Sequence, residues 1–213
     1  MKETECLEDL VNALKCLPGV GPKSALRLAY YLLQRNRSGA KKLSQSISTA
    51  LEQLGNCKLC NNFTEQEICN ICDSPKRDEN TLCVVEMPTD LLMMEQTRSY
   101  NGMYYVLMGR LSPLDGIGPK EIHLAKLIHR IKNADITEII LATNFTAEGN
   151  ATAQYIQDLL KDSKIKITRI ARGLPMGGEI EYIDSGTLAQ AVVERKKIES
   201  VSYTHLTLPT NCV

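Results

Sequence analysis

The sequence predicts an α/β protein in which a helical N-terminal part and a small metal-binding ribbon precede a mainly parallel sheet. Three observations carry this prediction. Apolar residues recur at helical spacing in the first part of the chain, two Cys-x-x-Cys pairs follow in CKLCNNFTEQEICNIC, and short β-branched runs then alternate with amphipathic segments. With 213 residues and 43% hydrophobic content, the chain can hold one ordinary domain with smaller modules attached.

Helices joined by short turns are expected before the cysteines. One helix face is predicted by apolar residues at i, i+3, i+4 and i+7, namely Leu7, Leu10, Val11 and Leu14. After the turn LPGVGP, Pro22 suits the first position of a second helix, because its missing N–H has no helical acceptor there. A third helix, ended by Gly55, is predicted by the stripe Leu43, Ile47, Leu51 and Leu54.

The glycine turn between the first two helices is a candidate site for nucleic-acid phosphates. Gly19 and Gly21 are free to take positive φ, and a helix N-terminus presents unpaired N–H groups to an anion. Lys23 and Arg27 lie four residues apart, hence on one helix face. From Lys15 to Lys42 there are seven basic residues and no acidic one, although Lys plus Arg equals Asp plus Glu at 25 each overall. We predict contacts to the backbone of DNA, without sequence preference.

The alternative for this segment is an ordinary helical hairpin with a solvated basic face. Tyr30 and Tyr31 could stack on bases, but they fall within the apolar run LAYYLL. We therefore expect both tyrosines to pack against neighbouring helices.

The four cysteines predict a structural zinc site. Two Cys-x-x-Cys knuckles separated by eight residues let four thiolates converge on one Zn²⁺, which leaves no open coordination position for catalysis; the ligands are Cys57, Cys60, Cys69 and Cys72. Disulfides or a redox pair are the alternative. The opening MKETECLEDL has no basic region followed by an apolar one, so we expect a reducing cytosol. Three cysteines sit singly in apolar patterns and are expected to be small buried hydrophobes: Cys6, Cys16 and Cys83.

Beyond the cysteines the pattern predicts a parallel sheet covered on both faces. The runs TLCVVEM, YYVLM, EIILAT and IKITRIA read as strands, and PKEIHLAKLIHRI and GNATAQYIQDLLKD read as helices between them. No stretch approaches the length of a membrane span. In such sheets function collects at the carboxyl ends of strands, which here carry Glu86, Gly109, Asn144 with Glu148, and Arg172 with Gly173.

Acidic residues at these strand ends raise the possibility of a magnesium enzyme. Glu86, Asp90, Asp115 and Glu148 are candidates, but a Mg²⁺ site for phosphoryl transfer needs two or three carboxylates that converge. EIILATN ends in Ala-Thr-Asn and offers no aspartate pair. We predict weak or absent Mg²⁺ binding. The glycine-rich GLPMGGEIEYIDSG lacks the ending of a P-loop, so it predicts no nucleotide site by itself.

Taken in order, these motifs resemble the RecR family of bacterial recombination mediators. The resemblance rests on LPGVGPKSALRLAYYLL, the paired CxxC motifs with NFTEQEIC, LCVVEMPTDL, GRLSPLDGIGP, TNFTAEGNATA and GLPMGGEIEYID, and it covers residues 3 to 198. It implies a helix-hairpin-helix over 1–55, a C4 zinc finger over 56–76, a Toprim α/β domain over 79–174 and a C-terminal assembly segment over 175–199. The uncharged tail 200–213 is expected to be foreign or disordered.

The resemblance also implies a function. Such a chain would be a cytoplasmic, nucleoid-associated, non-catalytic clamp on single- and double-stranded DNA in recombinational repair. As a homo-oligomer, from dimer to ring-like tetramer, it would help RecO and RecF load recombinase onto single strands coated by single-strand-binding protein. Gly19, Gly21, Lys23 and Arg27 would meet DNA, whereas Glu86, Glu148 and Asp90 would meet RecO.

The sequence departs from the family pattern at two positions, and two other functions remain as alternatives. Phe145 stands where the family usually has proline, and Met108 replaces a usual glycine. The alternatives are a catalytic Toprim nuclease or primase that uses Glu86 with Mg²⁺, and a zinc-ribbon adaptor that does not bind DNA.

Overall fold

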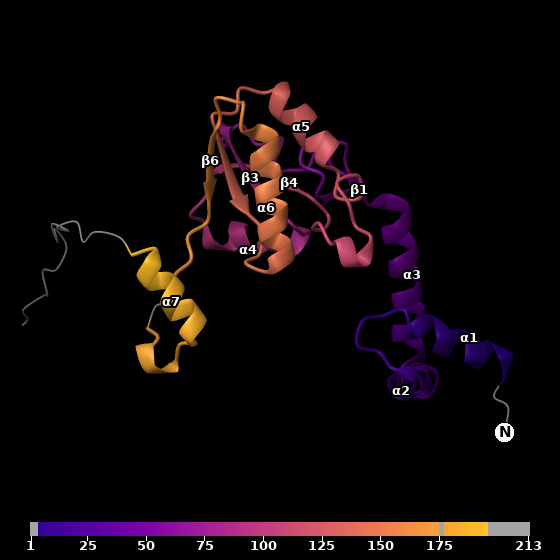
Figure 1. Cartoon of the computed structure of the whole chain (residues 1–213). Helices are drawn as coiled ribbons and strands as arrows, with labels where there is room; N and C mark the ends of the chain where they lie inside the picture. Colours follow the sequence, from indigo (N-terminus) through magenta and orange to yellow (C-terminus); the bar gives the residue numbers. More distant parts are fainter. Residues whose placement is uncertain (1–3, 175–176, 196–213) are drawn as a thin grey trace, which may run out of the picture.

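The computed structural model describes residues 4–174 and 177–195, and Figure 1 shows their arrangement. A helical N-terminal part, a cysteine ribbon, a four-stranded sheet with its helices and a C-terminal helical segment follow one another along the chain. The predicted mixed α/β fold is confirmed. The tail 200–213 lies outside the described residues.

Three helices form the N-terminal part, which stands beside the sheet in Figure 1: α1 (Glu5–Leu14), α2 (Pro22–Gln34) and α3 (Arg37–Gln53). Their small core contains Val11, Ala25 and Ala29. Gly19 takes a φ of +80°, as expected for the turn, but Gly21 has a φ of −79° and serves as the extended N-cap of α2. Only Gly19 therefore depends on the backbone freedom of glycine.

Several side chains of this part lie in solvent where burial was expected. Tyr30 and Tyr31 are 40% and 52% exposed, so the prediction that they pack is wrong. The alanines of α2 form the buried face instead, because their small side chains let α1 approach closely. Of the three single cysteines, Cys6 and Cys16 are exposed and Cys83 is buried as predicted. Burial raises the pKa of the Cys83 thiol to about 12.

The third helix is confirmed, yet its apolar stripe has no cover within the described residues. α3 begins at Arg37, where the side chain of Asn36 accepts a hydrogen bond of 2.9 Å from the Gly39 N–H. The stripe residues are exposed, Leu51 by as much as 80%, and no residue of α3 is buried. The stripe therefore forms an apolar surface on the single chain.

The cysteine ribbon is a two-stranded antiparallel hairpin that docks on the edge of the main sheet. Its strands are β1 (Gly55–Asn56) and β2 (Phe63–Thr64). The N–H of Val106 donates to the carbonyl of Cys60 at 2.8 Å, and Asn61 Nδ2 donates to the carbonyl of Val106 at 2.9 Å. Val106 belongs to an edge strand, so the ribbon satisfies backbone groups that the sheet leaves unpaired.

The main sheet has four parallel strands in the order β4-β3-β5-β6. They are β3 (Asp78–Val85), β4 (Gly102–Val106), β5 (Glu138–Ala142) and β6 (Lys166–Arg169). The helices are α4 (Pro88–Thr97), α5 (Leu124–Lys132), α6 (Ala147–Leu160) and α7 (Ser185–Val193), with 3-10 turns at Pro113–Asp115 and Ile180–Tyr182. α5 begins later than predicted because His123 adopts the left-handed region, with a φ of 54°.

Apolar side chains alternate along β3 and bury both faces of the sheet. Leu82 and Val84 belong to the larger core with α5 and α6, whereas Cys83 and Val85 belong to the core that includes Leu91 of α4. This alternation is the period of two expected of a strand, and it confirms the prediction of a sheet covered on both sides. Figure 1 shows the resulting layers.

An arginine fixes the segment that leads from the ribbon into β3. Arg77 Nη1 donates to Glu95 Oε1 at 2.9 Å and to the carbonyl of Gly102 at 3.2 Å. The hydrogen bonds from Arg77 lower the pKa of the Glu95 carboxyl, which keeps Glu95 ionised beside its partner. The pair thereby joins the ribbon exit, α4 and β4.

Candidate functional site

The four cysteines form one cluster whose geometry fits a zinc ion. Their sulfur atoms all lie within 4.8 Å of one another, the side chains are buried or nearly so, and the cysteines form no disulfide. Zn–S bonds of about 2.3 Å place tetrahedral sulfurs about 3.8 Å apart, so one ion fits among them. All four ligand positions come from the protein, which indicates a structural site.

Backbone turns of the ribbon aim the sulfurs at one another. Asn61, just after the first knuckle, has a φ of 63°, and its N–H donates to the carbonyl of Cys57 at 2.9 Å. The N–H of Cys69 donates to Cys57 Sγ at 3.3 Å. Cys60 and Cys69 share a hydrogen bond between their thiols. This bond raises the pKa of Cys60 and lowers that of Cys69. Such crowded thiols lose their protons when a cation binds among them.

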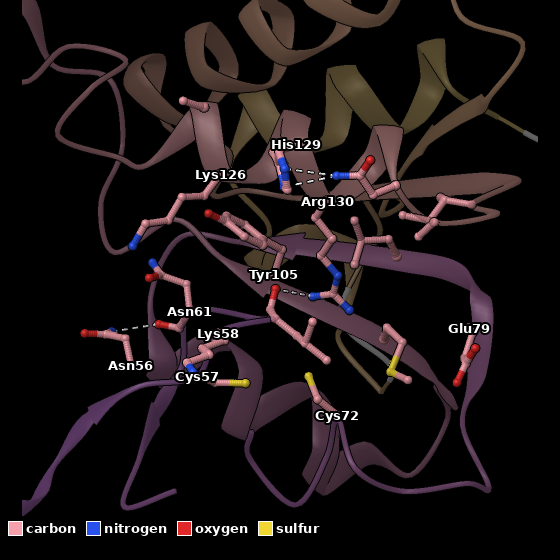
Figure 2. Close-up of a pocket in the computed structure, with 17 residues that line it drawn as sticks. Asn56, Cys57, Lys58, Asn61, Cys72, Glu79, Tyr105, Lys126, His129 and Arg130 are labelled. Atoms are coloured by element: carbon pink, nitrogen blue, oxygen red, sulfur yellow. Dashed lines mark hydrogen bonds between the residues drawn. The ribbon is translucent and has the colours of Figure 1, made fainter. Parts of the chain in front are cut away.

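A cavity of about 820 Å³ separates the ribbon from α5, and Figure 2 shows its lining. Arg130 crosses it: Nη1 donates to the carbonyl of Leu59 in the ribbon and to that of Tyr104 in β4, each at 2.7 Å. Arg130 therefore holds the ribbon against the sheet. Sequence reasoning missed this role, because an arginine on an amphipathic helix gives no sign of a partner 71 residues away.

The hairpin presents a free helix N-terminus, as predicted. Gly21 gives α2 no side-chain cap, and Pro22 occupies its first turn. Within residues 4–174 and 177–195, the N–H groups of Lys23 and Ser24 have no acceptor, since the first helical bond joins the Ala25 N–H to the Gly21 carbonyl. The side chains of Lys23 and Arg27 are exposed. This arrangement can bind a phosphate through backbone donors and two cations.

Glu86 lies at the carboxyl edge of the sheet but does not face solvent. It is 1% exposed, and Asn144 donates to both of its oxygens, from the backbone N–H and from Nδ2, each at 2.8 Å. The predicted direct contact of Glu86 with a partner is therefore corrected: the carboxylate holds the loop between β5 and α6. The side chain beside Glu86 is therefore an amide and not a second carboxylate.

Asp90 and Asp115 each accept a hydrogen bond of their own, and Glu148 lies near the start of a helix. Asp90 accepts a 2.8 Å hydrogen bond from the Met87 N–H and caps α4, whereas Glu148 lies in the first turn of α6. Asp115 accepts from Ser112 Oγ at 2.6 Å. In the described part of the chain, the cysteine cluster is the only group of three or more side chains placed to hold a metal.

The backbone conformation at Met108 explains why the family usually has glycine at this position. Met108 has a φ of 61°, in the left-handed region that favours glycine. The next N–H, of Gly109, donates to the carbonyl of Glu86 at 3.0 Å, so this tight turn lies beside the same edge. A methionine there carries backbone strain that a glycine would avoid.

The fold and these sites define a class of chain that joins a helical hairpin, a four-cysteine finger and a Toprim-type sheet. Family models match in the same order: the RecR helix-hairpin-helix over residues 7–51, the RecR zinc finger domain with four cysteines over 54–74, the Toprim domain over 80–171 and the RecR C-terminal segment over 173–196. "Recombination protein RecR" of Chromobacterium violaceum is 54% identical over 198 residues, which cover 93% of this chain and 100% of that protein. The chain belongs to the RecR family. None of the helices in the described residues is both long and apolar enough to cross a membrane.

Proposed function

We propose that this protein is a non-catalytic DNA-binding clamp of recombinational repair, acting in the bacterial cytoplasm. In this role it helps RecO and RecF load recombinase onto single-stranded DNA coated by single-strand-binding protein. The observation that carries the proposal is the uncapped N-terminus of α2 with Lys23 and Arg27 exposed beside it. Membership of the RecR family and the printed name of its relative support the process.

Zinc is proposed as the resident metal of the ribbon. Bound by Cys57, Cys60, Cys69 and Cys72, it would cross-link the two knuckles. The ribbon in turn covers the free edge of β4, which ties metal binding to the integrity of the sheet edge.

The absence of catalysis is proposed from the state of Glu86. Its two oxygens are occupied by Asn144, and a buried carboxylate that is already hydrogen-bonded is a poor ligand for an additional cation. Weak or absent Mg²⁺ binding follows. The nuclease or primase alternative would require Glu86 to exchange these hydrogen bonds for metal.

Assembly of several copies is proposed from the apolar stripe of α3. A helix that exposes Leu43, Ile47 and Leu51 on one face can bury them against the same face of a second copy. This supports a homo-oligomer, from dimer to ring. The proposed domain limits are 1–55, 56–76, 79–174 and 175–199.

DNA binding is tested by removing both hairpin cations. Lys23→Ala with Arg27→Ala is expected to weaken binding about equally for all sequences and to flatten the salt dependence by roughly two units for duplex DNA, because two phosphate contacts are lost. Fluorescence anisotropy in a salt titration measures both effects. Lys161→Ala with Lys164→Ala removes two exposed charges far along the chain and serves as control. Unchanged affinity of the hairpin variant at physiological salt would favour the zinc-ribbon adaptor.

We propose that acidic residues at the carboxyl edge of the sheet contact RecO. Glu148 is the main candidate and Asp90 the second, because Glu86 is buried. Glu148→Lys should weaken RecO binding by about tenfold at low salt while DNA binding is unchanged, because complementary charge orients docking. The difference should shrink as salt rises, since exposed charges are screened. Asp158→Lys, on the same helix and exposed, is the matched control. Equal RecO affinity of the two variants would remove this contact.

A further inference from the structure

A notch at the carboxyl edge of the sheet brings two arginines together around a phenylalanine. Phe145 lies in the loop after β5, Arg169 ends the neighbouring parallel strand β6, and Arg172 follows three residues later. The guanidinium carbons of Arg169 and Arg172 lie 4.5 Å and 4.7 Å from the centre of the Phe145 ring. This is the edge at which open α/β sheets bind ligands.

The two guanidinium groups are not neutralised by the protein around them. Within the described residues neither forms an ion pair, because the three ion pairs join other side chains. Burial and the nearby charge of Arg172 lower the pKa of Arg169, while Glu194 and Glu86 act in the opposite direction. Glu86 accepts hydrogen bonds from Asn144, and Glu194 accepts one from Gln190. In the described part of the chain, neither acid forms an ion pair with the two arginines, so the notch can take an external anion.

Polar atoms in the notch also lack partners. Arg169 donates one long hydrogen bond, from Nη2 to the carbonyl of Asn144 at 3.3 Å, and its buried Nε has no partner within the described residues. Oδ1 of Asn150 is likewise buried without one. Buried polar atoms in proteins are usually satisfied, and Asn150 also lines a cavity, so its free acceptor points to a ligand that donates a hydrogen bond there.

A cavity of about 520 Å³ is lined by Phe145, Asn150 and Arg172, but not by Arg169. Thr187 and Gln190 of α7 also line it. The volume lies in the range of small-ligand sites. Figure 1 places α7 on the opposite side of the molecule from α2, so this cavity is remote from the hairpin.

We propose that the notch binds a phosphate group together with its nucleoside, as a nucleotide of a DNA strand or a free nucleotide. The guanidinium fork of Arg172, which lines the cavity, matches phosphate oxygens bidentately, and Arg169 adds positive charge beside it. The exposed Phe145, at 40%, and the stacked guanidinium planes accept a base of any sequence. The inference rests on the proposed DNA-binding function and adds a second contact, distant from Lys23 and Arg27.

The test compares Arg172→Ala with Lys161→Ala, an exposed lysine at the far end of α6, in the full-length zinc-loaded chain. In one arm, anisotropy of a labelled oligothymidylate should show a three- to tenfold weaker affinity for Arg172→Ala and a salt slope flatter by about 0.7. In a second arm, thymidine monophosphate should raise the melting temperature of the wild type but not of Arg172→Ala. Arg172→Lys, which keeps the charge but loses the fork, should be intermediate.

The two arms distinguish a nucleotide within a DNA strand from a free nucleotide. Loss in the oligonucleotide arm identifies a strand as the ligand, and loss in the mononucleotide arm alone identifies a free nucleotide. Arg172→Ala equal to Lys161→Ala in both arms overturns the proposal. So does selective loss of poly-glutamate binding, which would assign the notch to an acidic protein. If the wild type binds no DNA, the proposed function fails, and the mononucleotide arm still decides the notch.

Discussion

Replacing Cys60 by alanine is expected to unfold the ribbon and to release the metal. Zinc binding contributes on the order of 10 kcal/mol in comparable zinc-finger peptides, and three remaining thiolates cannot close the tetrahedral site. The damage should spread, because the carbonyl of Cys60 accepts the Val106 N–H and the ribbon covers the β4 edge. An uncovered edge strand favours aggregation.

Metal analysis of the reduced protein measures this effect, with one equivalent of zinc expected for the wild type and much less for Cys60→Ala. Limited proteolysis should then cut within the ribbon of the variant. Cys16→Ala is the matched control, because Cys16 is an exposed cysteine outside the cluster and its loss should leave zinc content unchanged. Wild-type protein with well below one equivalent would contradict the zinc assignment.

Gly149→Ala is expected to destabilise the sheet domain by about 3 kcal/mol, the upper part of the range for overpacked sites. A methyl group there would lie 2.1 Å from the carbonyl oxygen of Asn144 and 2.7 Å from Glu86 Oε1. The nearer atom belongs to the backbone, so the loop between β5 and α6, which Glu86 holds, must move. In an ordinary helix the same change would stabilise by up to about 1 kcal/mol. A destabilising effect of Gly149→Ala would therefore show that the Asn144 carbonyl and Glu86 approach this position closely.

Urea unfolding followed by circular dichroism checks this prediction. Ala151→Gly, at an exposed position of the same helix, should cost only the helix propensity of about 1 kcal/mol. A Gly149→Ala protein as stable as the wild type would contradict this prediction. It would show that the loop between β5 and α6 can move at little cost, despite its hydrogen bonds to Glu86.

Short-range patterns were enough to predict the order of the elements and the metal ligands. Helical periodicity placed α1 and α3, and the turn with Pro22 placed the start of α2. β-branched runs placed all four parallel strands, and two Cys-x-x-Cys pairs identified the cluster. Such signals depend on residues close in sequence. The free N-terminus of α2 was predicted for the same reason, since Gly21 and Pro22 act on their own backbone.

Exposure at helix surfaces was harder to predict. Tyr30 and Tyr31 share an apolar run, but the face of α2 that meets α1 is made by Ala25 and Ala29. Which face is buried depends on the neighbouring helix and on how closely it approaches. A periodic pattern alone does not decide it.

The sequence by itself determined the fold class, the order of modules and the four cysteines of the metal-binding cluster, because periodicity and spacing are local properties. Only the tertiary structure decided what the strand ends do. It joined Glu86 to Asn144, 58 residues away, and it stacked Arg169 and Arg172 on Phe145. It also let Arg130 hold the ribbon across the cavity. These contacts form between segments far apart in sequence, where burial and hydrogen-bond geometry choose the partner.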